Sequence, residues 1–575
     1  MGAITDSELS RRDVLKLGAG AVAGAAALSV ARSLPAAAAP SNLNEMTVAQ
    51  MQAAMASKQL SSLDLVNYYL TRINTLDKAG PTVNSVIEVN PDAKAIAQSL
   101  DAERKAGHVR GPLHGIPVLL KDNVGTGDKM QTAAGSLGLV GSPAAHDSAV
   151  AANLRAAGAV ILGKTTLSEW ANFRSFFSTS GWSGRGGQCN NPYAVDRNAC
   201  GSSSGSGAAA SANFTAVSIG SETDGSIVCP ASMNGVVGIK PTVGLTSRGG
   251  VVPISHTQDT VGPHTRTVAD AAAVLTAIAQ RTPDPNDAAT ATNRNRIPAD
   301  YTAFLNPSGL SGARIGVCRD FSGHSPDADA VFETALTAMG NAGAILVDPV
   351  SFPHINDINS GNPEFTVLLF DFKADLQKYF ATRTGVPLAG GTLADAIAFN
   401  NAHAAQEMPF FAQEIFDLAE LFDITSTTAI QPLGLSYDDS IAMDKLFGAT
   451  EGIDKLLADF NLDAIVAPTD SPAFPTDLIN SDHFVFGSSS PAAIVGYPII
   501  NVPMGMTFGV PVGISFMASA FSEPTLIKLA SGFEAVTHAR QEPKFLATLP
   551  FNTRGLPNSV KRRKLQPSRV APFRI

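Results

Sequence analysis

The chain contains the stretch Cys200-Gly201-Ser202-Ser203-Ser204-Gly205-Ser206-Gly207, and soon after it Gly220-Ser221-Glu222-Thr223-Asp224-Gly225-Ser226. Upstream, the apolar run Ile116-Pro117-Val118-Leu119-Leu120 leads directly into Lys121. Each piece alone has an ordinary interpretation, because glycine- and serine-rich runs are usually flexible loops and a lysine after a strand is usually solvated. The information lies in finding all three pieces, in this order, in one chain.

Further stretches extend the pattern toward the C-terminus: Ile227–Thr242, Gln258–Pro263, Ile465–Thr469 and Gly509–Ile514. With them the chain resembles the amidase signature family, whose members hydrolyse amide bonds with a Ser–Ser–Lys triad. The resemblance implies an α/β fold with a large mixed, mostly parallel β-sheet covered by helices on both faces. Within the family, Glu222–Pro230 and Val251–Ser255 look most like the peptide amidases.

The resemblance also assigns the reacting residues. It implies that Ser226 is the nucleophile, that Ser202 relays the proton and that Lys121 is the base. Most members read Gly-Gly-Ser-Ser-Gly-Gly in the first loop, whereas Cys200 and Ser204 replace two glycines here. Three serines are therefore adjacent, and the spacing to Ser226 in the family favours Ser202 over Ser203.

Amide hydrolysis needs a nucleophile, a base and donors for the oxyanion. Ser226 follows Gly225 in a tight turn, so the turn amides of Thr223, Asp224, Gly225 and Ser226 are the expected oxyanion donors. Lys121 has to be neutral to act as a base, although an ordinary lysine has a pKa of about 10.4. The apolar run before it makes burial plausible, and burial lowers a lysine pKa. The family also has a cis peptide before the relay serine.

Other chemistries fit the sequence less well. Asp122 and Asp224 suggest a carboxylate or metal mechanism, but neither has partners at ligand spacing. The run Gly205–Ala210 matches a dinucleotide-binding fingerprint, yet no strand precedes it, as that motif requires. His114 is interpreted as structural, and the ten histidines form no metal-binding motif. We therefore expect no metal and no cofactor.

The N-terminus has the pattern of an export signal. Ser10-Arg11-Arg12-Asp13-Val14-Leu15-Lys16 fits the twin-arginine motif, and Ala36–Ala39 offers a small-residue cleavage site. The stretch between them, Leu17–Ala31, is too short to be a stable membrane span. An amphipathic helix or a retained anchor is the alternative interpretation. The expected location is periplasmic or extracellular.

Three parts are expected along the chain: an export signal at 1–39, the amidase signature domain at 40–548 and a basic, disordered tail at 549–575. The 575 residues are 45% hydrophobic, which provides ample core, and the net charge of −9 gives no support for nucleic-acid binding. The tail opposes this charge with a group of basic residues: Arg554, Lys561, Arg562, Arg563, Lys564, Arg569 and Arg574. A solvated tail is the simplest interpretation.

Hydrophobic spacing predicts an alternating α/β order. Helices are expected within 45–110, with Thr47 as an N-cap, and at 148–157, 328–341, 363–382 and 403–422. Strands are expected at 116–120, 159–162, 217–219, 236–239 and 313–318, with a polar surface connection at 281–310. Four cysteines are present, and two could form a disulfide in an exported protein. Cys189 and Cys200 both lie near the proposed site, but the pairing stays open.

The sequence thus predicts an exported serine amidase that converts C-terminal peptide amides to acid and ammonia through an acyl-enzyme. Its partner is a small amide or peptide amide, with no nucleic acid and no stable membrane insertion. Aryl amides, fatty amides and glutamine are the alternative substrates. Export argues against the glutamine role, which needs cytoplasmic partner proteins, and no apolar segment follows Pro40 for fatty amides. A non-catalytic amide-binding protein is disfavoured by retention of Lys121, Ser202 and Ser226.

Overall fold

The computed structural model describes residues 42–292 and 294–550. The proposed export signal lies outside these residues, as does nearly all of the proposed tail. Leu549, the first residue of the expected tail, is buried and packs with Tyr193 and Val510. Among the described residues, no helix has both the length and the apolar character needed to cross a membrane.

One eleven-stranded sheet organises the chain, in the order β1-β3-β2-β6-β8-β7-β12-β13-β11-β9-β10. A separate two-stranded sheet pairs β4 with β5. The strands are β1 (Val86–Val89), β2 (Pro117–Lys121), β3 (Val160–Thr165), β4 (Trp182–Ser183), β5 (Gly187–Gln188), β6 (Val217–Glu222), β7 (Val237–Lys240), β8 (Thr260–Thr265), β9 (Arg314–Cys318), β10 (Ile345–Val350), β11 (Ala464–Pro468), β12 (Ile499–Thr507) and β13 (Val510–Met517).

The sheet is mixed, as expected. Parallel neighbours lie toward the flanks, where β3, β2 and β6 run together on one side and β11, β9 and β10 on the other. At one edge β1 pairs antiparallel with β3. The strands between them pair antiparallel, from β6 through β8, β7, β12 and β13 to β11. Part of the reason is local: only Phe508 and Gly509, both with positive φ, join β12 to β13, and so short a turn forces an antiparallel hairpin.

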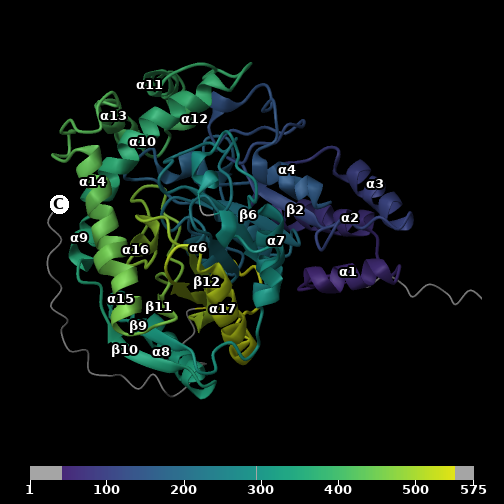
Figure 1. Cartoon of the computed structure of the whole chain (residues 1–575). Helices are drawn as coiled ribbons and strands as arrows, with labels where there is room; N and C mark the ends of the chain where they lie inside the picture. The colour runs from purple at the N-terminus through teal and green to yellow at the C-terminus, as the bar shows by residue number, and fades with distance from the viewer. Residues whose placement is uncertain (1–41, 293, 551–575) are drawn as a thin grey trace, which may run out of the picture. The chain divides into compact units, whose positions relative to one another are not determined.

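Helices pack along this sheet, among them α5 on β6, α7 on β8, α6 on β12 and β13, and α8 and α17 on β12 (Figure 1). The helices are α1 (Val48–Ala56), α2 (Ser62–Arg72), α3 (Ala93–Lys105), α4 (Ala149–Ala156), α5 (Ser204–Ser211), α6 (Val228–Met233), α7 (Val268–Ile278), α8 (Pro326–Asn341), α9 (Ile355–Ser360), α10 (Asn362–Ala381), α11 (Leu393–Ala402), α12 (Ala404–Glu407), α13 (Glu414–Glu420), α14 (Tyr437–Asp444), α15 (Asp454–Asp459), α16 (Ser490–Ala493) and α17 (Glu523–Thr537).

Most expected elements form where the hydrophobic spacing placed them, although the stretch 45–110, expected to be helical, also contains the strand β1. Thr47 caps α1 through a bond from the Gln50 amide, and the apolar run before Lys121 is the fully buried strand β2. The helix expected over 403–422 is instead two short helices, α12 and α13. Pro409 lies in the break, where proline cannot donate the backbone hydrogen bond that a continuous helix needs.

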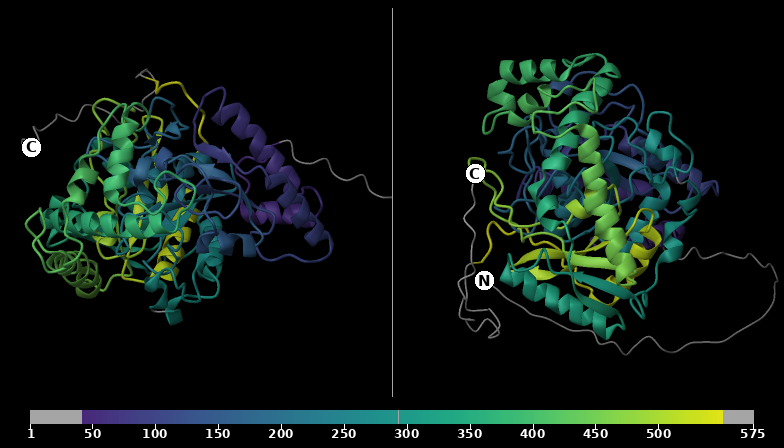
Figure 2. Two further views of the ribbon diagram at one scale, coloured as in Figure 1. Left: turned by 90° about the horizontal axis from the view of Figure 1, so that it is seen from above. Right: turned by 60° about the vertical axis from the view of Figure 1, so that its left-hand side comes forward.

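A second apolar cluster lies beside the main core. The helices α10, α11 and α13 contribute side chains such as Phe372, Leu393 and Phe416, which surround Trp170 and Leu167. Figure 2 shows the green segment that contains these helices gathered as a group. This region has no motif of its own in the sequence, and the middle of α10 binds the segment 254–259 through Asp371 and Asp375.

Candidate active site

Lys121 is the last residue of β2, and its side chain is fully buried. The strand lies between β3 and β6, both parallel to it, so apolar residues surround it on each face. The ammonium nitrogen lies 2.7 Å from Ser202 Oγ, 3.0 Å from Ser221 Oγ and 3.1 Å from the Ser221 carbonyl oxygen. The predicted base and the predicted relay serine are therefore in direct contact.

Burial lowers the pKa of Lys121 to about 7, because the charged form loses its hydration. The negative charges of Asp259 and Glu222 act in the opposite direction and limit this shift. At neutral pH a large share of the side chain is the neutral amine, which is the form that can accept a proton. Asn123 Nδ2 donates to Ser221 Oγ at 2.9 Å and so helps to position the hydroxyl beside the amine.

The serine run turns sharply before α5 begins at Ser204. Cys200 has a φ of 58°, and the peptide bond between Gly201 and Ser202 is cis, as in the family pattern. A Cβ atom on Gly201 would lie 2.2 Å from Ser168 Oγ, so only glycine fits there. The Ser202 carbonyl accepts from the Ser168 amide at 3.1 Å. Neighbouring backbone thus fixes the position of Ser202.

Ser226 lies in the turn between β6 and α6, and 8% of its surface is exposed. Gly225 has a φ of 77°, the left-handed conformation that a glycine adopts without strain. The Ser226 carbonyl accepts from the Ser203 amide at 3.2 Å, so this turn lies directly against the serine run. Within the described chain, the amides of Asp224, Gly225 and Ser226 donate to no backbone or side-chain acceptor. Free amides are what an oxyanion site requires.

A buried glutamate holds the far side of this turn. Glu222 Oε2 accepts from the amides of Ile227 at 2.7 Å and Val228 at 3.0 Å, the two residues after the predicted nucleophile. Burial raises the pKa of Glu222, while Lys240 and the two amide donors oppose the shift. The sequence motif contains Glu222 without indicating a role for it, because its partners come together only in the fold.

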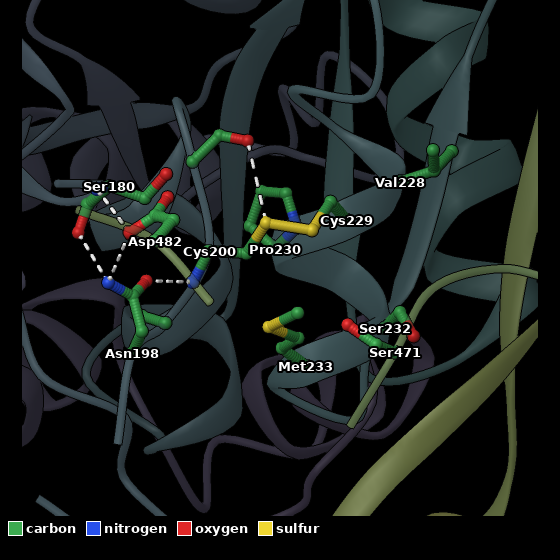
Figure 3. Close-up of a disulfide and its surroundings, with 12 residues drawn as sticks. Ser180, Asn198, Cys200, Val228, Cys229, Pro230, Ser232, Met233, Ser471 and Asp482 are labelled. Carbon is green, nitrogen blue, oxygen red and sulfur yellow. Dashed lines mark hydrogen bonds between the residues drawn. A yellow bond between two sulfur atoms is a disulfide. The ribbon is translucent and has the colours of Figure 1, made fainter. Parts of the chain in front are cut away.

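The pairing of the cysteines, open in the sequence, is resolved as a disulfide between Cys200 and Cys229, with Cys189 and Cys318 free and buried. Figure 3 shows the bridge joining the serine run to the start of α6. Asn198 fixes the same run, since its Oδ1 accepts from the Cys200 amide at 2.7 Å and its Nδ2 donates to Asp482 at 3.2 Å. One covalent bond therefore ties together the segments that carry Ser202 and Ser226.

The two aspartates of the alternative hypothesis have other partners. Asp122 is buried in an ion pair with Arg185 and accepts from the Gly135 amide at 3.1 Å. Asp224 accepts from the hydroxyls of Ser489, at 2.5 Å, and Ser490, at 2.6 Å. Neither belongs to a group of ligands in the described part of the chain.

One group of potential metal ligands is found among the described residues: His256, Asp371 and Asp375. Their atoms are largely engaged by protein donors. Asp371 Oδ2 accepts from two hydroxyls, and Lys378 Nζ donates to Asp375 Oδ1 at 2.9 Å. His256 Nδ1 lies 2.8 Å from Asp375 Oδ2, and this bond raises the pKa of the imidazole. The arrangement suits a protonated histidine better than a cation.

Two buried histidines contact backbone carbonyls. His114 is buried, with Nε2 3.0 Å from the Leu100 carbonyl, in keeping with a structural role. His264 lies behind the nucleophile turn, with Nε2 2.9 Å from the Ile227 carbonyl. Burial lowers the pKa of His264 to about 3, so the ring stays neutral at physiological pH. It holds the backbone after Ser226 and was not singled out from the sequence.

Comparison with known proteins agrees with the resemblance seen in the sequence. The Amidase family model matches residues 64–527, most of the chain. The chain belongs to the amidase signature family. This amidase is 44% identical over 514 residues to a protein named "Probable amidase" from Arabidopsis thaliana, an alignment that covers 88% of this chain and 93% of the relative. The chain is accordingly an enzyme that hydrolyses amide bonds.

Two further relatives indicate the range of the family. The native peptide amidase of Stenotrophomonas maltophilia superposes with a TM-score of 0.80 at 48% identity, covering 87% of this amidase and 99% of that chain. An amidase family protein from Bacillus anthracis superposes with a TM-score of 0.77 at 34% identity, covering 87% of this amidase and 92% of that chain.

Proposed function

We propose that this amidase uses Ser226, Ser202 and Lys121 as a catalytic triad to convert C-terminal peptide amides into the free acid and ammonia. The observation that carries the proposal is the 2.7 Å contact between the Lys121 amine and Ser202, next to the turn that contains Ser226. The peptide preference is supported by the likeness to the peptide amidase of Stenotrophomonas maltophilia.

In the proposed acylation step, Ser226 Oγ attacks the carbonyl carbon and forms a C–O bond. The Ser226 proton passes to Ser202 Oγ, and the Ser202 hydroxyl proton passes to Lys121 Nζ. The oxyanion that develops is stabilised by the turn amides of Thr223, Asp224, Gly225 and Ser226. One lost donor of this kind typically raises the barrier by about 3–4 kcal/mol.

The proton then returns by the same route to the leaving nitrogen, the C–N bond breaks, and ammonia leaves an acyl-enzyme. Water attacks the acyl carbon in the second half of the cycle and transfers a proton through Ser202 to Lys121. Breakdown of the tetrahedral adduct releases the carboxylic acid and restores the Ser226 hydroxyl. Lys121 is neutral at the start of each half, which fits its pKa of about 7.

A substrate panel tests the proposal. Peptide amides, aryl amides, fatty amides and glutamine are compared by ammonia release, with Ser226→Ala as the control. We expect the highest kcat/KM for peptide amides and no turnover in the variant. A higher kcat/KM for another class would refute the peptide preference but not the triad. Turnover by Ser226→Ala above a few per cent of wild type would refute the triad.

We also propose export by the twin-arginine route, on the basis of Ser10–Lys16 in the sequence. The Cys200–Cys229 disulfide supports it, because disulfides persist mainly in oxidising compartments. Cell fractionation of the wild type and of the Arg11→Lys, Arg12→Lys double variant tests the proposal. We expect the variant to be retained in the cytoplasm, and equal export of both proteins would contradict it.

A further inference from the structure

The turn that contains the predicted oxyanion donors is held at its near end by a carboxylate from a different segment. Thr223 Oγ1 donates to Asp259 Oδ1 at 2.6 Å. The other oxygen, Asp259 Oδ2, accepts from the amides of Ile254 at 2.8 Å and Ser255 at 3.0 Å. Both side chains are nearly buried, with 8% of Thr223 and 9% of Asp259 exposed. A fully engaged carboxylate therefore binds the turn three residues before the predicted nucleophile.

The segment 254–259 is itself fixed from outside the sheet, by helix α10. The hydroxyls of Ser255 and Thr257 donate to Asp371 Oδ2 at 2.6 and 2.9 Å. The amide of His256 donates to Asp375 Oδ2 at 2.9 Å. Asp371 and Asp375 are one helical turn apart, so three consecutive residues of the segment bind one face of α10. A continuous chain of hydrogen bonds therefore runs from α10 through Asp259 to Thr223.

Asp259 also acts on the base. Its charge raises the pKa of Lys121, as does that of Glu222, against the larger effect of burial. Burial raises the pKa of Asp259 itself to about 6, while its hydrogen bonds and the nearby Arg248 favour the charged form. Asp259 is therefore mostly a carboxylate at neutral pH. The same group bonds to the oxyanion turn and lies within electrostatic reach of the lysine.

We propose that Asp259 is a positioning residue for the amidase reaction, which through Thr223 holds the turn Thr223–Ser226 in the geometry that receives the oxyanion. This inference rests on the proposed triad and extends it. During acylation Lys121 takes a proton and becomes an ammonium, while the carbonyl π electrons move onto the substrate oxygen. Asp259 assists both changes, because it fixes the donors for the oxyanion and its negative charge favours the ammonium.

A pair of Thr223 variants isolates the positioning bond. Thr223→Val keeps the shape of the side chain and removes the hydroxyl, whereas Thr223→Ser keeps the hydroxyl. We expect Thr223→Val to lower kcat by about 10- to 100-fold with little change in KM, and Thr223→Ser to stay within about threefold of wild type. Affinity for a peptide aldehyde, which forms a tetrahedral adduct with the nucleophile, should fall by the same factor as kcat/KM. Equal effects of the two variants, or a loss confined to KM, would overturn the proposal.

Asp259→Asn tests the electrostatic part. The amide still fills the space but has no charge, so the acid limb of the kcat/KM profile should move to lower pH, because the ammonium of Lys121 loses a stabilising neighbour. Asp284→Asn is the matched control, since Asp284 lines the same cavity of about 940 Å³ as Asp259 and does not contact the turn. We expect the control to keep the wild-type profile. An acid limb that stays in place in Asp259→Asn would overturn this part.

The outcomes separate this inference from the proposed triad. Any amide that the enzyme hydrolyses can serve, so the experiments do not depend on the peptide preference. If Ser226→Ala or Lys121→Ala retains activity, the triad fails whatever Thr223 does. If both are inactive and the two Thr223 variants behave alike, only the role of Asp259 fails. Should Asp259→Asn fail to fold, the Thr223 pair still decides the positioning role.

Discussion

The carboxyl ends of β2 and β7 offer a comparison within one sheet. Each strand ends in a fully buried lysine, Lys121 in β2 and Lys240 in β7. Burial lowers the pKa of Lys121 to about 7 and that of Lys240 to about 8, while neighbouring carboxylates oppose the shift in both. The two side chains are therefore equally buried, and the pKa of each is well below that of an ordinary lysine.

Their hydrogen-bond partners differ. Lys240 Nζ donates to the carbonyls of Tyr497 and Ala492, and a carbonyl oxygen can only accept. Lys121 Nζ contacts the hydroxyls of Ser202 and Ser221, and a hydroxyl can also donate to the lone pair of a neutral amine. The contact with Ser202 can therefore survive loss of the lysine proton. Burial lowers the pKa of both lysines, and only the amine of Lys121 has the serine hydroxyl partner that the proposed proton transfer requires.

The largest difference between the two lysines is expected when each amine is removed in turn. Lys121→Met should lower kcat/KM by about 10³-fold or more, since loss of proton transfer alone typically accounts for 10²- to 10⁴-fold. Lys240→Met should stay within roughly tenfold of wild type, because no hydroxyl links its amine to a serine. Ammonia release from a peptide amide measures both. Comparable losses in the two variants would show that the hydroxyl partner is not the distinguishing feature.

Serine variants test whether the hydroxyl in contact with Lys121 is the one that matters for activity. Ser202→Ala removes the hydroxyl that contacts Lys121 and should lower kcat by about 10²-fold or more. Ser203 Oγ donates instead to the Ser221 carbonyl at 2.9 Å, so Ser203→Ala should have a smaller effect. Steady-state kinetics on one substrate rank the two. The reverse ranking would shift the relay to Ser203.

The pH profile tests which lysine sets the activity. The base has to be neutral, so kcat/KM should rise with pH and level off above a midpoint near 7, falling about tenfold per pH unit below it. The measurement runs from pH 5 to pH 10 on an uncharged peptide amide. Lys240→Met should keep this acid limb. A midpoint near 10 would mean that Lys121 is not desolvated in solution.

Stability provides a test that does not depend on activity. The unfolded chain keeps the Lys121 proton up to its ordinary pKa of 10.5, whereas the native protein releases it near 7, so the free energy of unfolding should rise with pH between these values. Lys121→Met removes this contribution. The variant should be more stable than wild type by roughly 4 kcal/mol at pH 7, with the gap closing to less than about 1 kcal/mol at pH 10. Urea unfolding at several pH values measures the difference, and a gap independent of pH would contradict the linkage.

The sequence indicates the residues of the proposed site where the information is local. Lys121 follows an apolar run, and Ser226 follows a glycine in a turn, so both are visible in a few neighbouring residues. The family resemblance then links them in one triad. The alternation of helices and strands and the cap at Thr47 follow from periodicity and capping chemistry, and the mixed sheet follows from the family resemblance.

The rest depends on contacts that only the folded chain creates. Asp259 bonds to Thr223 across 36 positions, and its segment is in turn held by Asp371, more than a hundred positions further on. Hydrophobic periodicity carries no information about hydrogen bonds between residues so far apart in the sequence. The disulfide could not be assigned because four cysteines allow several pairings. The helical stretch expected over 403–422 forms as two short helices, and Pro409 lies in the break between them.

The Cys200–Cys229 bridge should affect the storage life of this enzyme without affecting its specific activity. Both cysteines are nearly inaccessible, with 5% and 3% of their surface exposed, so a reductant reaches the bridge mainly after the chain has opened. We therefore expect a reducing buffer to leave the initial rate of the folded enzyme unchanged. It acts on the opened molecules, which lose the cross-link that limits their disorder and so return less often to the native state. Storage life and specific activity then respond independently to the same additive.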